Sequence, residues 1–235
     1  MAKKQKSNYS GVLLLFGAVV IGVLFTGNIH GQITKDILNR MEKHYKALVT
    51  LRADIIMSKY NGQLGKKRGD VSGALSYIPE AERREMRIRI DWTSPVQESI
   101  IVRGNKYWLF QPTLKQTIYG TSDSDNVKGA GNALAFLSRD KDQLKANYDI
   151  KYVGVEEIVG GISTWHLRMI PKITTSYRQS EVWADPDGMV RQAMVIENNE
   201  DSTTIRLSNL KKNDDKFNAK VFEPAFPSGT RMMPG

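Results

Sequence analysis

Alternation between apolar and charged residues is the feature that most restricts the fold of this chain. It is clearest in residues 85–92, where every second residue is large and apolar: Met86, Ile88, Ile90 and Trp92. The residues between them are charged: Arg87, Arg89 and Asp91. Because successive side chains of a strand point to opposite faces, this period of two predicts a strand with one buried and one solvated face.

Similar runs recur along the chain and predict ten further strands. They cover residues 51–60, 71–78, 98–103, 106–111, 116–119, 149–156, 163–170, 176–184, 189–197 and 203–209. Turn residues separate several of them: Asn61-Gly62, Gly104-Asn105, Gly160-Gly161 and Asp185-Pro186-Asp187-Gly188. Short strands joined by such turns predict a mainly β chain with few helices (α+β), in which an antiparallel meander of about eleven strands curls into a barrel or part-barrel.

Two segments have helical patterns. The first, residues 33–49, places its apolar side chains on one stripe of a helix: Ile33, Ile37, Leu38, Met41, Tyr45 and Leu48. In the second, a loop rich in Ser, Asp and Gly (residues 120–132) precedes residues 133–147, which are helical in composition. An insertion of this kind must lie across the sheet or over one mouth of it, so residues 120–147 are predicted to form a lid.

The N-terminus has the three-part layout of a secretory signal peptide. Three lysines precede an uncharged run of 15 residues at positions 11–25, and small or polar residues follow up to Gly31. A helix of that length spans about 22 Å at about 1.5 Å per residue, less than the roughly 30 Å of a hydrocarbon core. We therefore predict a cleavable signal peptide over residues 1–31, with cleavage near Gly31–Gln32, and a periplasmic protein; a retained anchor is the alternative.

The predicted mature chain, residues 32–235, has the length of one domain. Without the three lysines of the leader, the net charge of +9 falls to +6. In an exported protein this surplus fits transient contact with an anionic membrane surface, or simply a soluble basic surface, and not nucleic acid. The chain has no Cys, so it forms no disulfide and carries no lipid on a cysteine of its own.

The sequence predicts neither an enzyme nor a cofactor or metal site. It lacks the H-E-x-x-H, G-x-S-x-G and Walker A patterns, and only His44 and His166 follow the predicted leader. On its strand His166 shares a face with Thr164 and Arg168, which predicts a solvent-exposed ring. The Asp185-Pro186-Asp187-Gly188 sequence resembles the start of a calcium loop but lacks the later ligands, so a hairpin turn is the better interpretation.

Large apolar residues are more numerous than a plain core requires. A wide antiparallel sheet that curls without closing leaves an apolar concave face, and such a face under a lid suits acyl chains. The predicted lining of this cavity is Met86, Ile88, Ile90, Trp92, Trp108, Phe110, Leu134, Phe136 and Leu137. Packing of a closed core explains each of these residues at least as well, so both interpretations stay open.

A long segment in the middle of the chain has a recognisable pattern: Pro95-x-x-Glu98-Ser99-Ile100-Ile101-Val102-x-Gly104-x-x-Tyr107-Trp108-x-Phe110-x-Pro112-x-x-x-Gln116. Other motifs agree in order, namely the helix at 37–48, Gly73-x-Leu75, Asp187-Gly188, the run at 204–210 and Phe222-x-Pro224-x-x-Pro227-x-Gly229. Together, over residues 33–231, they resemble the LolA-type periplasmic lipoprotein carriers. The motifs are packing motifs, so they specify the fold better than the cargo.

The resemblance implies a strongly curved antiparallel half-barrel with helices covering its concave face. It also implies a monomeric carrier that receives acylated lipoproteins from an inner-membrane ABC transporter and passes them to an outer-membrane acceptor of similar fold. In the family an Arg next to a Pro latches the lid. Here the region between Gly73 and Pro95 is longer and Pro79 precedes the arginines, so the latch is carried over only to Arg83 or Arg84. Because only six residues follow Gly229 here, we expect no C-terminal extension of the kind that some carriers have.

Two other functions stay open. One is a periplasmic sensor, or a carrier of another lipid, on the same fold; the identity of the cargo would separate it from a lipoprotein carrier. The other is a structural part-barrel held in an envelope complex by an uncleaved N-terminus, which cleavage at residue 31 would exclude.

Overall fold

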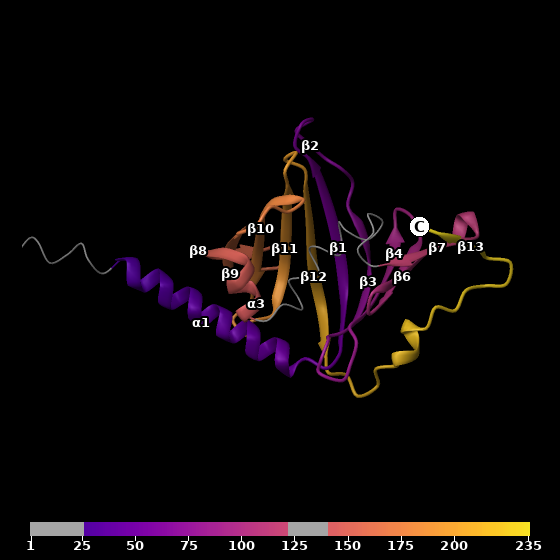
Figure 1. The fold of residues 1–235 in the computed structure, drawn as a ribbon, viewed down its shortest axis with the longest axis horizontal. Coiled ribbons are helices and arrows are strands. Elements are labelled where there is room, and N and C mark those ends of the chain that lie inside the picture. Colours follow the sequence, from indigo (N-terminus) through magenta and orange to yellow (C-terminus); the bar gives the residue numbers. More distant parts are fainter. Residues whose placement is uncertain (1–25, 122–140) are drawn as a thin grey trace, which may run out of the picture.

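The computed structural model describes residues 26–121 and 141–235, most of which lie in one large curved sheet (Figure 1). Its strands are β1 (Leu51–Asn61), β2 (Lys66–Lys67), β3 (Val71–Ile78), β4 (Arg87–Ser94), β5 (Glu98–Arg103), β6 (Lys106–Gln111), β7 (Gln116–Thr121), β8 (Tyr148–Ile158), β9 (Ile162–Pro171), β10 (Tyr177–Ala184), β11 (Val190–Glu197), β12 (Ser202–Lys212) and β13 (Arg231–Pro234). Their order is β13-β7-β6-β5-β4-β3-β1-β12-β11-β10-β9-β8, and β2 pairs with β1. Since β13 and β8 lie at opposite ends of this order, the sheet curves without closing, as predicted.

The sheet has thirteen strands and not the predicted eleven. The two extra strands leave little trace in the sequence, because β2 has only two residues and β13 ends in Pro234 without any alternation. The pairing of β13 with β7 is parallel, whereas the other pairings are antiparallel. The prediction of a purely antiparallel sheet is therefore wrong at this one edge.

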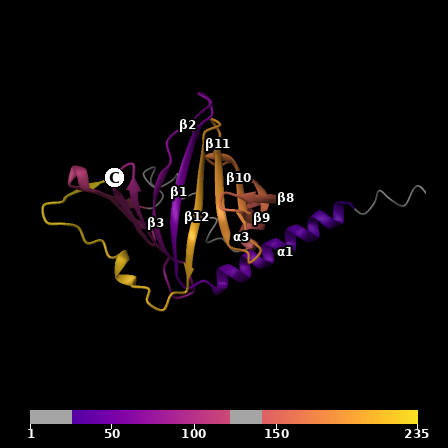
Figure 2. The ribbon, with the colours of Figure 1, turned by 180° about the vertical axis from the view of Figure 1, so that it is seen from behind.

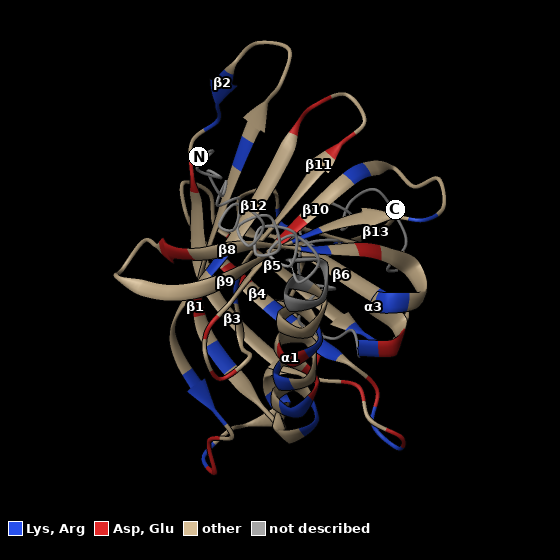
Figure 3. Cartoon of the chain, turned by 90° about the vertical axis from the view of Figure 1, so that its left-hand side faces the viewer, with Lys and Arg blue, Asp and Glu red and all other residues tan. Residues whose placement is uncertain are grey.

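Helix α1 (Thr26–Ala47) lies in front of the curved sheet, on the face that we call the inner face (Figure 3). Its residues Ile37, Leu38 and Met41 are buried in the same cluster as the apolar residues of the strands, which confirms the predicted stripe. The helix begins earlier than predicted, so that the point between Gly31 and Gln32 lies within it; cleavage there stays a prediction. Within the described residues no helix is long and apolar enough to cross a membrane, and the apolar run at 11–25 lies outside them.

Helix α3 (Lys141–Asn147) is the described part of the predicted helix at 133–147; residues 133–140 lie outside the described residues. Its Leu144 is buried in the inner-face cluster. Lys141 Nζ lies 3.0 Å from the Glu42 carboxylate and donates to Asn39 Oδ1 at 3.1 Å, so α3 is joined to α1. Hydrogen bonds from Lys46 and Lys141 hold the pKa of the Glu42 carboxyl below its ordinary value.

The turn between β10 and β11 packs directly against α1, where Arg40 Nη1 donates to the carbonyl of Pro186. Asp185 Oδ1 accepts hydrogen bonds from the backbone N–H groups of Asp187 and Met189, which confirms the hairpin-turn interpretation. Gly188 has φ of +88°, and a Cβ atom there would lie 2.4 Å from the backbone carbonyl of Arg40. A glycine is required at this position because the helix backbone comes so close.

After β12 the chain crosses the outer face of the sheet (Figure 2). We call residues 213–235 the C-terminal strap. Its short 3-10 helix η3 (Ala219–Phe222) packs on β4 and β5, where Phe222 is fully buried and Arg89 Nη1 donates to the carbonyl of Val221 at 2.9 Å. The strap ends by adding β13 to β7. It therefore covers part of the outer face and pairs with one edge of the sheet.

Candidate functional site

The inner face carries one continuous apolar cluster, to which almost every strand contributes. Strand register arranges its residues in rows. One row, from β13 to β1, is Met233, Ile118, Leu109, Ile100, Ile90, Leu75 and Ala53. The next row is Tyr107, Val102, Ile88, Tyr77 and Leu51. On the other half of the sheet, α1 packs against β8 and adds its own apolar stripe to the cluster.

The stripe predicted from residues 85–92 lies on this inner face. Ile88, Ile90 and Trp92 are 8%, 2% and 5% exposed, and Met86 packs against them at the edge of the cluster. The structure thus brings these four residues together, on the side of the sheet where α1 and α3 lie. Binding of acyl chains by them remains a proposal.

Trp108 and Phe110 lie on the outer face, so the prediction that they line the same cavity as the stripe is wrong. Trp108 pairs with Ile101, and the Phe110 ring lies 5.4 Å from the ring of Phe226 in the C-terminal strap. Residues 107–110 are Tyr-Trp-Leu-Phe, an apolar run without alternation. Such a run predicts a strand but not which of its two sets of side chains faces the core; the register with β5 places Tyr107 and Leu109 inside.

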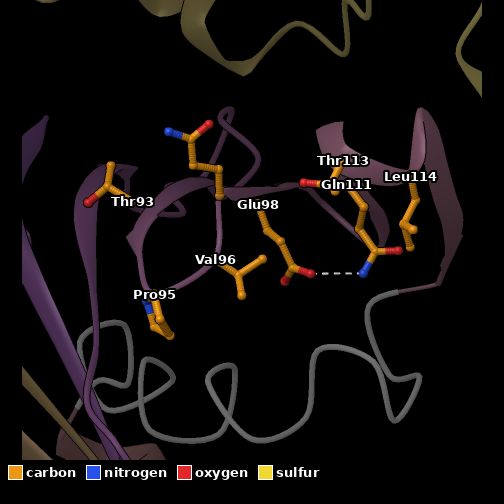
Figure 4. A pocket seen from close by; sticks show the side chains of 8 residues that line it. Thr93, Pro95, Val96, Glu98, Gln111, Thr113 and Leu114 are labelled. Carbon is orange, nitrogen blue, oxygen red and sulfur yellow. Dashed lines mark hydrogen bonds between the residues drawn. The ribbon is translucent and has the colours of Figure 1, made fainter.

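The apolar rows end at one rim of the sheet in a polar row, formed by Glu98, Gln111, Gln116 and Arg231. A pocket of about 590 Å³ opens beside it, between the β4–β5 turn and the loop that holds the 3-10 helix η1 (Pro112–Leu114) (Figure 4). Its lining residues are Thr93, Pro95, Val96, Gln97, Glu98, Gln111, Thr113 and Leu114. Sequence patterns do not single out this row, because its four members come from four different strands.

The comparison with known proteins agrees with this architecture. A family model described as "Outer membrane lipoprotein carrier protein LolA" matches residues 82–225, more than half of the chain. The chain belongs to the LolA family. No curated protein sequence matches it significantly.

Solved structures show that the fold is shared although the sequences have diverged. An uncharacterised conserved protein from Thermus thermophilus has a TM-score of 0.54 at 10% identity, with 87% of this chain and 100% of that chain covered. In the MucA/MucB complex of Pseudomonas aeruginosa, the matching chain has a TM-score of 0.50 at 15% identity, with 82% of this chain and 61% of that chain covered. At these identities the similarity establishes a shared fold alone.

The lid and its latch, as expected for the LolA family, stay predictions. Leu134, Phe136 and Leu137 lie outside the described residues. Arg84 Nε donates to the carbonyl of Pro79 at 3.0 Å, within its own turn, and Arg83 is exposed.

The prediction that His166 is solvent-exposed is wrong: the residue is 5% exposed. Its ring stacks on Trp183 at 4.3 Å, Nδ1 lies 2.8 Å from Glu156 Oε1, and Nε2 lies 2.9 Å from Glu181 Oε2. Arg168 and Gln179 also donate to Glu181. The alternation placed His166 on the correct, outer face, but the side chains of β8 and β10 that cover it are distant in sequence.

This outer-face cluster predicts a pH dependence of stability. Hydrogen bonds from Trp183 and then His166 hold the pKa of the Glu156 carboxyl below its ordinary value of 4.5. Because the folded-state pKa is the lower one, the stabilisation is present above about pH 4.5 and is lost as the pH falls through the folded-state pKa. Since the Glu156 side chain is 46% exposed, we expect at most about 1 kcal/mol.

Denaturant unfolding between pH 6 and pH 3 measures this effect. The Glu156→Gln variant should lose less stability over this range than the wild type. The matched control is Glu157→Gln, whose side chain is exposed on the other face of β8. Equal slopes for wild type and Glu156→Gln would contradict the assignment.

Proposed function

We propose that this chain is an exported, periplasmic carrier that holds the acyl chains of lipoproteins against its inner face and moves them from the inner to the outer membrane. By resemblance, an inner-membrane ABC transporter is the donor and an outer-membrane protein of similar fold is the acceptor. The proposal includes binding and release but no chemical reaction, cofactor or metal. Within the described residues, no group of His, Asp or Glu is arranged to hold a metal ion.

The observation that carries the proposal is the continuous apolar inner face of an unclosed sheet. A closed barrel would fill its interior with its own side chains. In an unclosed sheet the corresponding surface is covered instead by separate elements, here α1 and α3, and these can move without breaking the strand pairing. Such a surface suits ligands that must both enter and leave.

The free energy of acyl-chain transfer explains why such a carrier is needed and why its affinity for the chain must be limited. Each methylene group transferred out of water contributes about 0.8 kcal/mol, so a 16-carbon chain in water costs on the order of 12 kcal/mol. The inner-face side chains are already buried against one another, Ile90 being 2% exposed. An acyl chain therefore replaces contacts that the empty protein makes with itself, and the difference between the two sets of contacts is small enough to permit release.

The four tryptophans of the chain allow a direct test, because two lie on each face. Trp92 and Trp165 lie on the inner face, where the guanidinium of Arg40 from α1 stacks over Trp165 at 5.4 Å. Trp108 and Trp183 lie on the outer face. Bromine quenches indole fluorescence on contact, so a dibrominated acyl chain reports which tryptophans it touches.

In four single-tryptophan variants, with the other three changed to Phe, a dibrominated triacylated lipopeptide should quench Trp92 and Trp165 but not Trp108 and Trp183. Equal quenching of all four would mean surface adsorption, and no quenching of Trp92 and Trp165 would reject the proposal. The same titration with a dibrominated phospholipid tests the alternative cargo. Stronger binding of the phospholipid would favour a carrier or sensor of other lipids.

A further inference from the structure

The inner face changes from apolar to polar within one step of the strand register. Ile90 on β4 is paired with Ile100 on β5, and two residues further along each strand Trp92 is paired with Glu98. Beyond β5 the same step leads from Leu109 and Ile118 to Gln111 and Gln116. A ligand that lies along the apolar rows therefore meets polar side chains at this end of the sheet.

The polar row is a directed chain of hydrogen bonds. Arg231 Nη2 donates to Gln116 Oε1 at 3.0 Å, Gln116 Nε2 donates to Gln111 Oε1 at 2.7 Å, and Gln111 Nε2 donates to Glu98 Oε1 at 2.8 Å. Glu98 is the last acceptor. Within the described residues, the second oxygen of its carboxylate accepts no hydrogen bond. The row thus holds one carboxylate in position and leaves it with acceptor capacity.

The pocket beside this carboxylate has a mixed character. Figure 4 shows Glu98 and Gln111 joined by their hydrogen bond, with Val96 on one side and Leu114 on the other. Val96 and Leu114 are 53% and 58% exposed, so both offer apolar surface to a ligand in the pocket. Among these lining residues Glu98 is the charged one, and its carboxylate only accepts hydrogen bonds, so the pocket favours an N–H donor and repels a phosphate.

We propose that this pocket binds the amide N–H headgroup of an N-acylated peptide while its acyl chains occupy the inner face. The inference rests on the proposed function, since it assigns the polar end of the same cargo. Trp92 is the point where the two parts meet, because it belongs to the apolar stripe and is paired with Glu98. The headgroup contact selects acylated peptides over lipids that carry the same chains on phosphate.

Two probes that differ only by an N–H group in place of an oxygen atom test the proposal. The first is the methyl ester of an N-acylglycine, and the second is the corresponding acyl ester of methyl glycolate, in which oxygen replaces the N–H group. With the same dibrominated acyl chain on both, quenching of Trp92 gives the two dissociation constants. A hydrogen bond to a charged acceptor should make the amide probe bind about tenfold more tightly to the wild type.

The Glu98→Met variant should lose this tenfold preference and bind the two probes with equal affinity, because its side chain offers no charged acceptor. Glu98→Gln, which keeps an acceptor oxygen without the charge, should retain a smaller preference. Glu200→Met, a change at an exposed glutamate in the turn between β11 and β12, is the control and should keep the full preference. Circular dichroism and denaturant unfolding verify that each variant is folded.

Equal binding of both probes to the wild type would overturn this inference and leave the proposed function standing. A preference that survives in Glu98→Met would also overturn it. No quenching of Trp92 by either probe would be a failure of the proposed function itself.

Discussion

Replacing Ile90 with Glu should abolish acyl-chain binding and lower the free energy of unfolding by more than about 3 kcal/mol. The side chain is 2% exposed in the middle of an apolar row, so the new carboxylate would be desolvated without a partner. Ile90→Thr is the milder form of the same test. It keeps the branch at Cβ but removes the δ-methyl group and buries one hydroxyl, and it should cost about 1–3 kcal/mol while still weakening binding.

Ile101 supplies a matched control. It is also an isoleucine with 2% exposure, and it lies on the neighbouring strand β5, but its side chain points to the outer face of the sheet. Ile101→Thr should lower the free energy of unfolding by a similar amount and leave the affinity for the brominated lipopeptide unchanged. Denaturant unfolding and Trp92 quenching measure the two quantities. If both threonine variants had the same affinity, the inner-face rows would not be the acyl site.

Replacing Phe222 with Ala should lower the free energy of unfolding by about 3–5 kcal/mol. The ring is 1% exposed between the C-terminal strap and the outer face, and it stacks near Phe217 at 5.9 Å. Its loss leaves a cavity and weakens the attachment of the strap, to which the hydrogen bond from Arg89 to Val221 and the contact of Phe226 with Phe110 also contribute. We therefore expect faster amide exchange in β13 and in its partner β7, while acyl binding stays at the wild-type level.

The control for Phe222→Ala is Met232→Ala, a change in β13 at a side chain that is 48% exposed. It should leave stability within about 0.5 kcal/mol of the wild type. Unchanged exchange of β13 in Phe222→Ala would mean that the pairing with β7 holds the end of the strap without the buried ring.

Two strands show where sequence reasoning succeeds and where it stops. In β4 the alternation is complete, so both the strand and its inner set of residues, Ile88, Ile90 and Trp92, follow from the sequence. In β6 all of residues 107–110 are apolar, and the strand follows but its orientation does not. The outward position of Trp108 and Phe110 is set by the register with β5, and on that side Phe226 of the strap packs on Phe110.

The buried His166 and the polar row at the rim lie beyond the reach of local patterns. His166 is covered by Trp183, Glu156 and Glu181, which two neighbouring strands bring to it. The bond between Arg231 and Gln116 joins residues that are 115 positions apart. Neither cluster exists until the sheet has formed in its final register.

The sequence by itself determined which segments form eleven of the thirteen strands, the apolar stripe of the first helix and the family to which the chain belongs. These are properties of short segments, because backbone geometry repeats every two residues in a strand and every 3.6 in a helix. The tertiary structure alone decided that β1 lies between β3 and β12, that β13 pairs with β7, which face α1 and the strap each cover, and which polar residues meet at the rim. Those outcomes depend on contacts between distant segments, whose free energy is gained only when the whole sheet is assembled.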